Sequence, residues 1–316
     1  MEEPLRPRTS TPAWRRAART ARWLLAAYLI VVLGMTMIER WLVYPAPPRP
    51  SADTAAPEDA ETVWIDVPPA RGGGEPTRVH GWLFPAPGGE PCRRAVLFCH
   101  GNGEDVTNLP PIARTLRDTL DAAVLVFDYR GYGMSDGKPH EAGVVADTRA
   151  AQRFLAERCG VDTDRVVLFG RSLGGAAAIA AAADDGAAAL VAQCTFTRLT
   201  DAAASHYPWL PVHWVMRNRF DSVARITAYT GPVWVCHGTA DEVVPFEQGR
   251  RLYEAATGPK RFVELPGVRH DAGRPTSYYR ELRRFLDERA AGWGPETADP
   301  GLAAASSEID AASPAD

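Results

Sequence analysis

Short apolar runs alternate with segments of helical periodicity through most of the chain. Continuous runs rich in β-branched residues lie at Ala95–Cys99, Ala123–Asp128, Arg165–Phe169, Ala188–Cys194, Gly231–Cys236 and Arg261–Leu265. Such runs are typical of strands buried in a parallel sheet. Sequence that favours helices lies between and after them, at about 109–120, 141–159, 176–183, 247–256 and 275–289. The alternation predicts an α/β domain with a mostly parallel sheet, helices on both faces and right-handed crossovers.

Two further strands are expected before this pattern begins. Thr62–Val67 and Arg78–Phe84 flank a loop around Gly72–Gly74 and would form an antiparallel entry to the sheet. With them the predicted domain covers residues 61–290. The preceding segment 45–60 is rich in proline and small residues, which predicts a stiff linker away from the membrane. Residues 291–316 have the composition of a disordered tail.

The amino end has the pattern of a membrane anchor. Residues 1–22 carry six arginines against Glu2 and Glu3, and Trp23–Ile38 then runs for sixteen residues without a charge. With the aromatic segment that follows, residues 23–44 are long enough to span a bilayer. The positive-inside rule predicts a basic cytoplasmic arm over 1–22 and an extracytoplasmic domain after residue 44. A removable signal peptide is the main rival, although small residues for cleavage are missing after Ile38.

Composition excludes several classes of function. A net charge of −4 and a pI near 6.0 give no reason to expect a nucleic-acid partner. The five cysteines show no spacing typical of a metal site, so neither a metal nor a cofactor is predicted. Cys99, Cys194 and Cys236 each lie near the end of a core strand, where a buried thiol is expected. Cys92 and Cys159 lie in loops and could pair in an oxidising compartment, which the sequence leaves open.

The segment Val166–Gly175 contains the pattern Gly-x-Ser-x-Gly between a strand and a helix. This context predicts a nucleophile elbow that holds Ser172 at the carboxyl edge of the sheet. Two later loops at the same edge supply the partners of a serine nucleophile. Asp241 follows the strand that ends at Cys236, and His270 follows the last strand. The order Ser, Asp, His is that of a nucleophile-elbow hydrolase. Glu242 is the alternative acid, but its side chain should point away if that of Asp241 points inward.

Two backbone N–H groups are expected to bind an oxyanion. Leu173 follows the nucleophile at a helix N-terminus, and Asn102 lies in the loop after Cys99 between two glycines. His100 and His237 close their strands in His-Gly turns, where bonding to loop backbone is the expected role.

Four motifs together resemble the α/β-hydrolase superfamily, and most closely its serine-aminopeptidase-like branch with membrane-anchored members. They are His100–Gly103, Asp128–Ser135, Gly170–Gly175 and His237–Pro245. The resemblance covers about 61–290 and implies the α/β-hydrolase fold, a Ser172–His270–Asp241 triad, and Asn102 and Leu173 as the oxyanion hole. Arg269 departs from the pattern, since the family often has glycine there, and it could raise the local positive potential.

A short insert after the sixth strand, Phe196–Tyr229, is aromatic and apolar. Tyr207, Trp209, Trp214 and Met216 are predicted to wall one side of the site, although packing on the core is an equal alternative. An apolar wall and a membrane anchor favour a hydrophobic acyl substrate, an ester or thioester. Two alternatives remain, namely a peptidase or amidase with the same triad, and an inactive hydrolase fold used as an interaction module at the membrane. The sequence gives no indication of oligomeric state.

Overall fold

A computed structural model describes residues 13–51, 54–69, 76–89, 92 and 94–290. Eight strands form one sheet in the order β1-β2-β4-β3-β5-β6-β7-β8. Their bounds are β1 Glu61–Val67, β2 Thr77–Phe84, β3 Ala95–Cys99, β4 Ala123–Phe127, β5 Val166–Arg171, β6 Ala189–Gln193, β7 Val233–Gly238 and β8 Lys260–Leu265. β2 is antiparallel to β1 and β4, and every other pairing is parallel. The predicted mostly parallel sheet with an antiparallel entry is confirmed.

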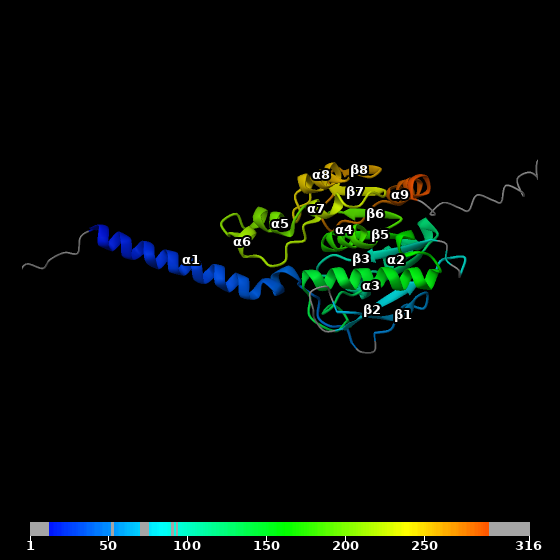
Figure 1. Cartoon of the computed structure of the whole chain (residues 1–316), viewed down its shortest axis with the longest axis horizontal. Helices are drawn as coiled ribbons and strands as arrows, with labels where there is room; N and C mark the ends of the chain where they lie inside the picture. Colours follow the sequence, from blue (N-terminus) through cyan, green and yellow to red (C-terminus); the bar gives the residue numbers. More distant parts are fainter. Residues whose placement is uncertain (1–12, 52–53, 70–75, 90–91, 93, 291–316) are drawn as a thin grey trace, which may run out of the picture.

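Helices cover both faces of the sheet (Figure 1). The main ones are α2 Pro110–Leu120, α3 Glu141–Cys159, α4 Leu173–Asp185, α8 Phe246–Ala255 and α9 Thr276–Arg289. One core cluster joins the sheet to α3, α4 and α8, and a second joins its other face to α2 and α9. Two 3₁₀ turns, Val106–Asn108 and Thr163–Arg165, precede α2 and β5. Strands β3 to β6 are almost wholly buried, which is why they are continuously apolar.

The insert after β6 forms three short helices, α5 Leu199–His206, α6 Val212–Val215 and α7 Ser222–Ile226. α5 and α6 stand out from the body of the domain on the side where α1 joins it (Figure 1). They lie beyond the carboxyl edge of the parallel strands, which is the edge that carries Ser172. The insert therefore covers the candidate site.

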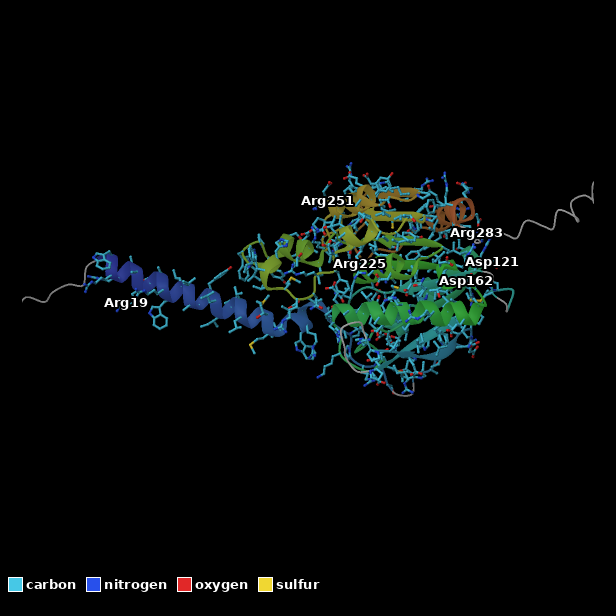
Figure 2. All side chains as sticks on the ribbon, viewed as in Figure 1. Arg19, Asp121, Asp162, Arg225, Arg251 and Arg283 are labelled. Atoms are coloured by element: carbon cyan, nitrogen blue, oxygen red, sulfur yellow. A yellow bond between two sulfur atoms is a disulfide. The ribbon has the colours of Figure 1, made fainter. Side chains whose placement is uncertain are left out.

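The helix α1 spans Ala13–Val43 and projects from the domain (Figures 1 and 2). It starts before the predicted anchor at Trp23, because Ala and Arg in the preceding segment are strong helix formers. Arg19 lies on this projecting part (Figure 2). From Trp14 to Val43 the helix is long and apolar enough to cross a membrane. A helix of this length and composition is common to membrane anchors and signal sequences.

The proline-rich segment after α1 lies against the domain instead of separating the two. Arg49 donates a hydrogen bond to the carbonyl oxygen of Met134 at 2.8 Å, and Asp59 forms ion pairs with Arg114 and Arg117 of α2. The predicted spacer is wrong in this respect. Proline-rich composition excludes a core, but it does not prevent a segment from packing along one.

Candidate active site

Ser172 occupies a strained turn between β5 and α4. Its φ of 54° and ψ of −119° lie in a region that residues other than glycine rarely adopt. Two hydrogen bonds hold the turn. Ser172 N–H donates to the carbonyl oxygen of Gln193 at 2.9 Å, and Thr195 Oγ1 donates to the Ser172 carbonyl oxygen at 2.7 Å. The backbone strain thus falls at the residue that the sequence singles out as a nucleophile.

The glycines around Ser172 are required by close contacts. A Cβ at Gly170 would lie 2.2 Å from the carbonyl oxygen of Gly174, and a Cβ at Gly174 would lie 2.1 Å from that of Cys99. A Cβ at the next residue, Gly175, would meet Thr195 at 2.6 Å. The Gly-x-Ser-x-Gly-Gly sequence thus allows α4 to start directly against β3 and β5.

His270 connects the two other residues predicted as a triad. Its Nε2 lies 3.0 Å from Ser172 Oγ, and its Nδ1 lies 2.7 Å from Asp241 Oδ2. Asp241 comes from the loop after β7 and His270 from the loop after β8, so three elements converge at one edge of the sheet. The distances permit a hydrogen-bonded chain from carboxylate to imidazole to hydroxyl.

Asp241 is held as an ionised carboxylate. Its side chain is fully buried, and burial opposes ionisation, but hydrogen bonds from His237, His270 and the Val244 N–H outweigh this and lower the pKa of Asp241. Oδ1 accepts from the N–H groups of Val243 and Val244 at 2.9 and 2.8 Å, while His237 Nε2 lies 3.2 Å from Oδ2. His237 also bonds the Val244 carbonyl oxygen at 2.9 Å, as its predicted backbone role requires.

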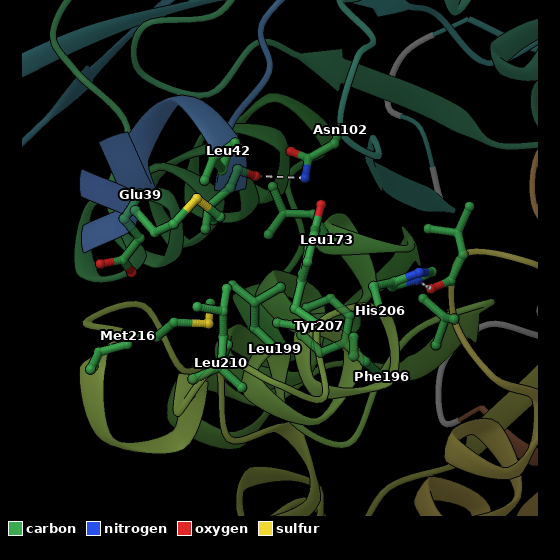
Figure 3. Close-up of a pocket in the computed structure, with 18 of the residues that line it drawn as sticks. Glu39, Leu42, Asn102, Leu173, Phe196, Leu199, His206, Tyr207, Leu210 and Met216 are labelled. Carbon is green, nitrogen blue, oxygen red and sulfur yellow. Dashed lines mark hydrogen bonds between the residues drawn. The ribbon is translucent and has the colours of Figure 1, made fainter. Parts of the chain in front are cut away.

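Leu173 and Asn102 both border the cavity that contains Ser172. Leu173 is the first residue of α4, so its N–H has no acceptor within the helix. The side chain of Asn102 is engaged on both sides. Its Nδ2 donates to the Val43 carbonyl oxygen at 2.7 Å (Figure 3), and its Oδ1 accepts from Tyr132 Oη at 2.8 Å. These bonds orient the backbone of the loop that was predicted to complete an oxyanion hole.

Glu104 links this loop to the elbow, which the sequence did not reveal. Its Oε2 accepts from the Gly101 N–H at 3.0 Å, and its Oε1 is paired with Arg171, the residue before Ser172. From the Asp128–Ser135 motif, Tyr129 Oη adds a bond to the His100 carbonyl oxygen at 3.0 Å. The only available signal was that Glu104 adjoins the motif His100–Gly103 and that Arg171 lies within Gly170–Gly175.

Arg269 does not leave a free positive charge beside His270. It pairs with Glu242, and both side chains are largely exposed. Glu242 is thus paired with Arg269, while Asp241 is the carboxylate bonded to the His270 imidazole. The pairing corrects the expectation of raised positive potential.

The cavity beside Ser172 has a volume of about 270 Å³. Most of its lining comes from α1, the elbow and the insert, and it includes Tyr207 and Met216 of the predicted wall (Figure 3). Trp209 and Trp214 do not border it, and they are 54% and 87% exposed. For these two residues the predicted wall is wrong, because they lie on the outer side of the insert.

One group of side chains has atoms close enough to hold a metal ion, within the described part of the chain. Ligand atoms of Cys194, His237 and Asp241 lie within 4.8 Å of one another. Burial raises the pKa of the Cys194 thiol, which opposes the thiolate that a metal needs. Its sulfur accepts a hydrogen bond from Arg274 at 3.0 Å, and Asp241 is bonded to His270. The partners of these side chains therefore account for the group without a metal ion: His237 and His270 bond Asp241, and Arg274 bonds Cys194.

Comparisons with known proteins show the family of the chain. The family model described as serine aminopeptidase, S33, matches residues 90–223. The uncharacterized protein Rv2307c of Mycobacterium tuberculosis is 38% identical over 278 residues, covering 84% of this chain and 95% of that protein. The alpha/beta hydrolase domain-containing protein WAV2 of Arabidopsis thaliana is 31% identical over 232 residues, covering 66% of this chain and 72% of that protein.

Solved structures resemble the fold at low sequence identity. The Pyrococcus furiosus esterase Pf2001 matches with a TM-score of 0.60 at 17% identity, over 77% of this chain and 97% of that one. An acetyl xylan esterase from Paenibacillus sp. R4 matches with a TM-score of 0.59 at 18% identity, over 74% and 90%.

Proposed function

The chain belongs to the α/β-hydrolase superfamily, and from this premise we propose that it is a serine hydrolase of carboxylic esters or thioesters. One observation carries the proposal. The His270 imidazole bridges Ser172 Oγ at 3.0 Å and Asp241 Oδ2 at 2.7 Å. A carboxylate hydrogen-bonded to an imidazole, which is in turn hydrogen-bonded to a strained serine, supplies the groups that acyl transfer needs.

In the proposed acylation step, Ser172 Oγ attacks the substrate carbonyl carbon while His270 Nε2 takes its proton. Asp241 fixes the tautomer with Nδ1–H and stabilises the imidazolium. The N–H groups of Leu173 and Asn102 would stabilise the oxyanion, each worth about 3–4 kcal/mol. Collapse of the intermediate expels the alcohol or thiol, which receives the proton from His270.

In the second step, water attacks the acyl-enzyme ester. His270 takes a proton from this water and returns it to Ser172 Oγ as the carbon–oxygen bond to the enzyme breaks. The acid leaves and the free enzyme is restored. The chain's own residues account for every proton transfer in the cycle.

The cavity favours esters and thioesters over peptides as substrates, because it offers no available carboxylate among the described residues that line it. An aminopeptidase needs an acidic group for the substrate's amine. Glu39 is the only carboxylate among the described residues that line the cavity, and its oxygens accept hydrogen bonds from Arg217 and Asn218. An inactive interaction module would not need the bonds that ionise Asp241, so it is the weaker alternative.

We further propose that α1 is an uncleaved anchor and that the domain lies outside the cytoplasm. The arginines before Trp23 support this orientation. So does the disulfide between Cys92 and Cys159, because disulfides persist mainly in oxidising compartments. Protease added outside intact cells should degrade the domain, and full protection there would contradict the orientation.

The proposed chemistry is tested with p-nitrophenyl esters. The full chain in detergent should hydrolyse them, and Ser172→Ala should lose at least about a thousand-fold in kcat/KM while its circular dichroism spectrum and thermal midpoint remain close to those of the wild type. Equal activity in both proteins would show that the nucleophile is another residue. Activity on p-nitroanilide amides but not on esters would favour the peptidase alternative.

A further inference from the structure

One side of α1 lines the cavity that contains Ser172. The residues on this side recur every three or four positions, as one face of a helix requires. They are Val32, Met35, Thr36, Glu39, Leu42 and Val43, and all of them except Leu42 are partly or fully buried. Met37, between them in sequence, is 77% exposed and does not border this cavity. The helix therefore has a cavity face and an outer face.

Glu39 fastens the cavity face to the insert. Its carboxylate accepts hydrogen bonds from the N–H groups of Arg217 and Asn218, at 3.0 and 2.9 Å, and from the Asn218 amide at 2.9 Å. The residue is only 7% exposed. A buried carboxylate is costly unless such partners satisfy it, so these bonds hold the α1–insert contact in place. An anchor that only tethered the domain would need no such contact.

The end of α1 also contacts the predicted oxyanion loop. The Val43 carbonyl oxygen accepts from Asn102 Nδ2 at 2.7 Å, and Tyr44 Oη donates to Asn218 Oδ1 at 2.8 Å. Figure 3 shows Leu42 and Glu39 of α1 facing Met216, Leu210 and Leu199 across the cavity. The cavity thus lies between α1 and the insert, with Ser172 and Leu173 in its wall.

The insert lies beside α1 within the apolar run. Tyr28 Oη donates to the Trp209 carbonyl oxygen at 3.0 Å, and Tyr28 lies in the middle of Trp23–Ile38. Trp209 and Trp214 are exposed on the same insert. Exposed apolar and aromatic side chains that gather on one surface mark a site of contact with a membrane or a partner. The outer side of the insert is therefore suited to contact lipid together with α1.

We propose that α1 forms one wall of the acyl-chain site, and that the substrate is a lipid ester whose chain reaches Ser172 along α1 from within the bilayer. The proposal rests on the proposed ester hydrolysis. The lining is mostly apolar, and both oxygens of Glu39 already accept hydrogen bonds from the insert. A cavity of about 270 Å³ is small for a ligand site and suits a single chain.

The wall is tested with a matched pair of variants on α1, Met35→Trp on the cavity face and Met37→Trp on the outer face. The measured quantity is the ratio of kcat/KM for a dodecanoyl ester to that for an acetyl ester, per active site titrated with a fluorophosphonate. Met35→Trp should lower this ratio about ten-fold or more, because the indole occupies space that the chain needs. Met37→Trp should leave it within about two-fold of the wild type. Met35→Ala, which cannot overpack, should shift the preference to longer chains.

Unchanged ratios in both Met35 variants, with normal titration of the serine, would overturn the wall and leave ester hydrolysis standing. Absence of titratable serine and of hydrolysis in the wild type would instead overturn the proposed function.

Entry from the bilayer is tested with two vesicle populations. The full chain is reconstituted in one, and a long-chain ester that exchanges slowly between vesicles is placed in the same or in separate vesicles. Hydrolysis confined to shared vesicles is the expected result. Equal rates in both arrangements would contradict entry along α1.

Discussion

At Asp241, two backbone N–H groups and two histidines converge on one buried carboxylate. These bonds lower its pKa, so the group stays ionised well below the ordinary range for aspartate. With a lowered folded-state pKa, its contribution to stability is present above the unfolded pKa and is lost as the pH falls through the folded value. Loss of activity on mild acidification should therefore arise from another group.

Asp241→Asn should reduce kcat of ester hydrolysis by about 10⁴-fold, because an amide cannot hold the His270 tautomer that accepts the serine proton. The neighbouring carboxylate provides a matched control. Glu242→Gln removes an exposed ion pair with Arg269, keeps the acceptor oxygen and leaves Asp241 in place, so it should change kcat little. Steady-state kinetics of both variants, with circular dichroism to verify folding, show which of the two carboxylates is the acid of the triad. A larger loss for Glu242→Gln would mean that the acid is misassigned.

At the scale of elements, the elbow depends on how closely α4 approaches β3. A Cβ at Gly174 would lie 2.1 Å from the carbonyl oxygen of Cys99, which is backbone and cannot rotate away. Gly174→Ala should therefore lower the free energy of unfolding by about 3 kcal/mol. Gly88→Ala is the control, since nothing lies within 4 Å of a Cβ there. Thermal midpoints in the same detergent compare the two, and equal midpoints would contradict the close approach.

The strands were predictable because buried parallel strands have continuous apolar sequence, and their order placed Ser172, Asp241 and His270 at one edge. The three helices of the insert were not predicted. They span four to eight residues, which is too short for a helical period to show. The aromatic residues of the insert also gave no indication of which side of it faces the site, so Trp209 and Trp214 were placed on the wrong side.

At the scale of the whole molecule, the sequence predicts an anchor and a domain as separate units, whereas in the structure α1 packs against the insert of the domain. Glu39 directly follows the uncharged run Trp23–Ile38, and the sequence alone gives no sign that it is buried, because its partners are not evident there. Those partners, Arg217 and Asn218, are distant in sequence. The link between Glu104 and Arg171 was missed for the same reason. Local patterns predict elements, whereas contacts between loops depend on how the elements are assembled.

The most direct test of the account is to label the full chain with a fluorophosphonate and locate the adduct by peptide mass spectrometry. Trypsin should release the segment Ser172–Arg198, in which Ser172 is the only serine. We predict one adduct, on this peptide, and none in Ser172→Ala. A folded wild-type protein that remains unlabelled, or an adduct on another peptide, would contradict the assignment of Ser172 as the nucleophile.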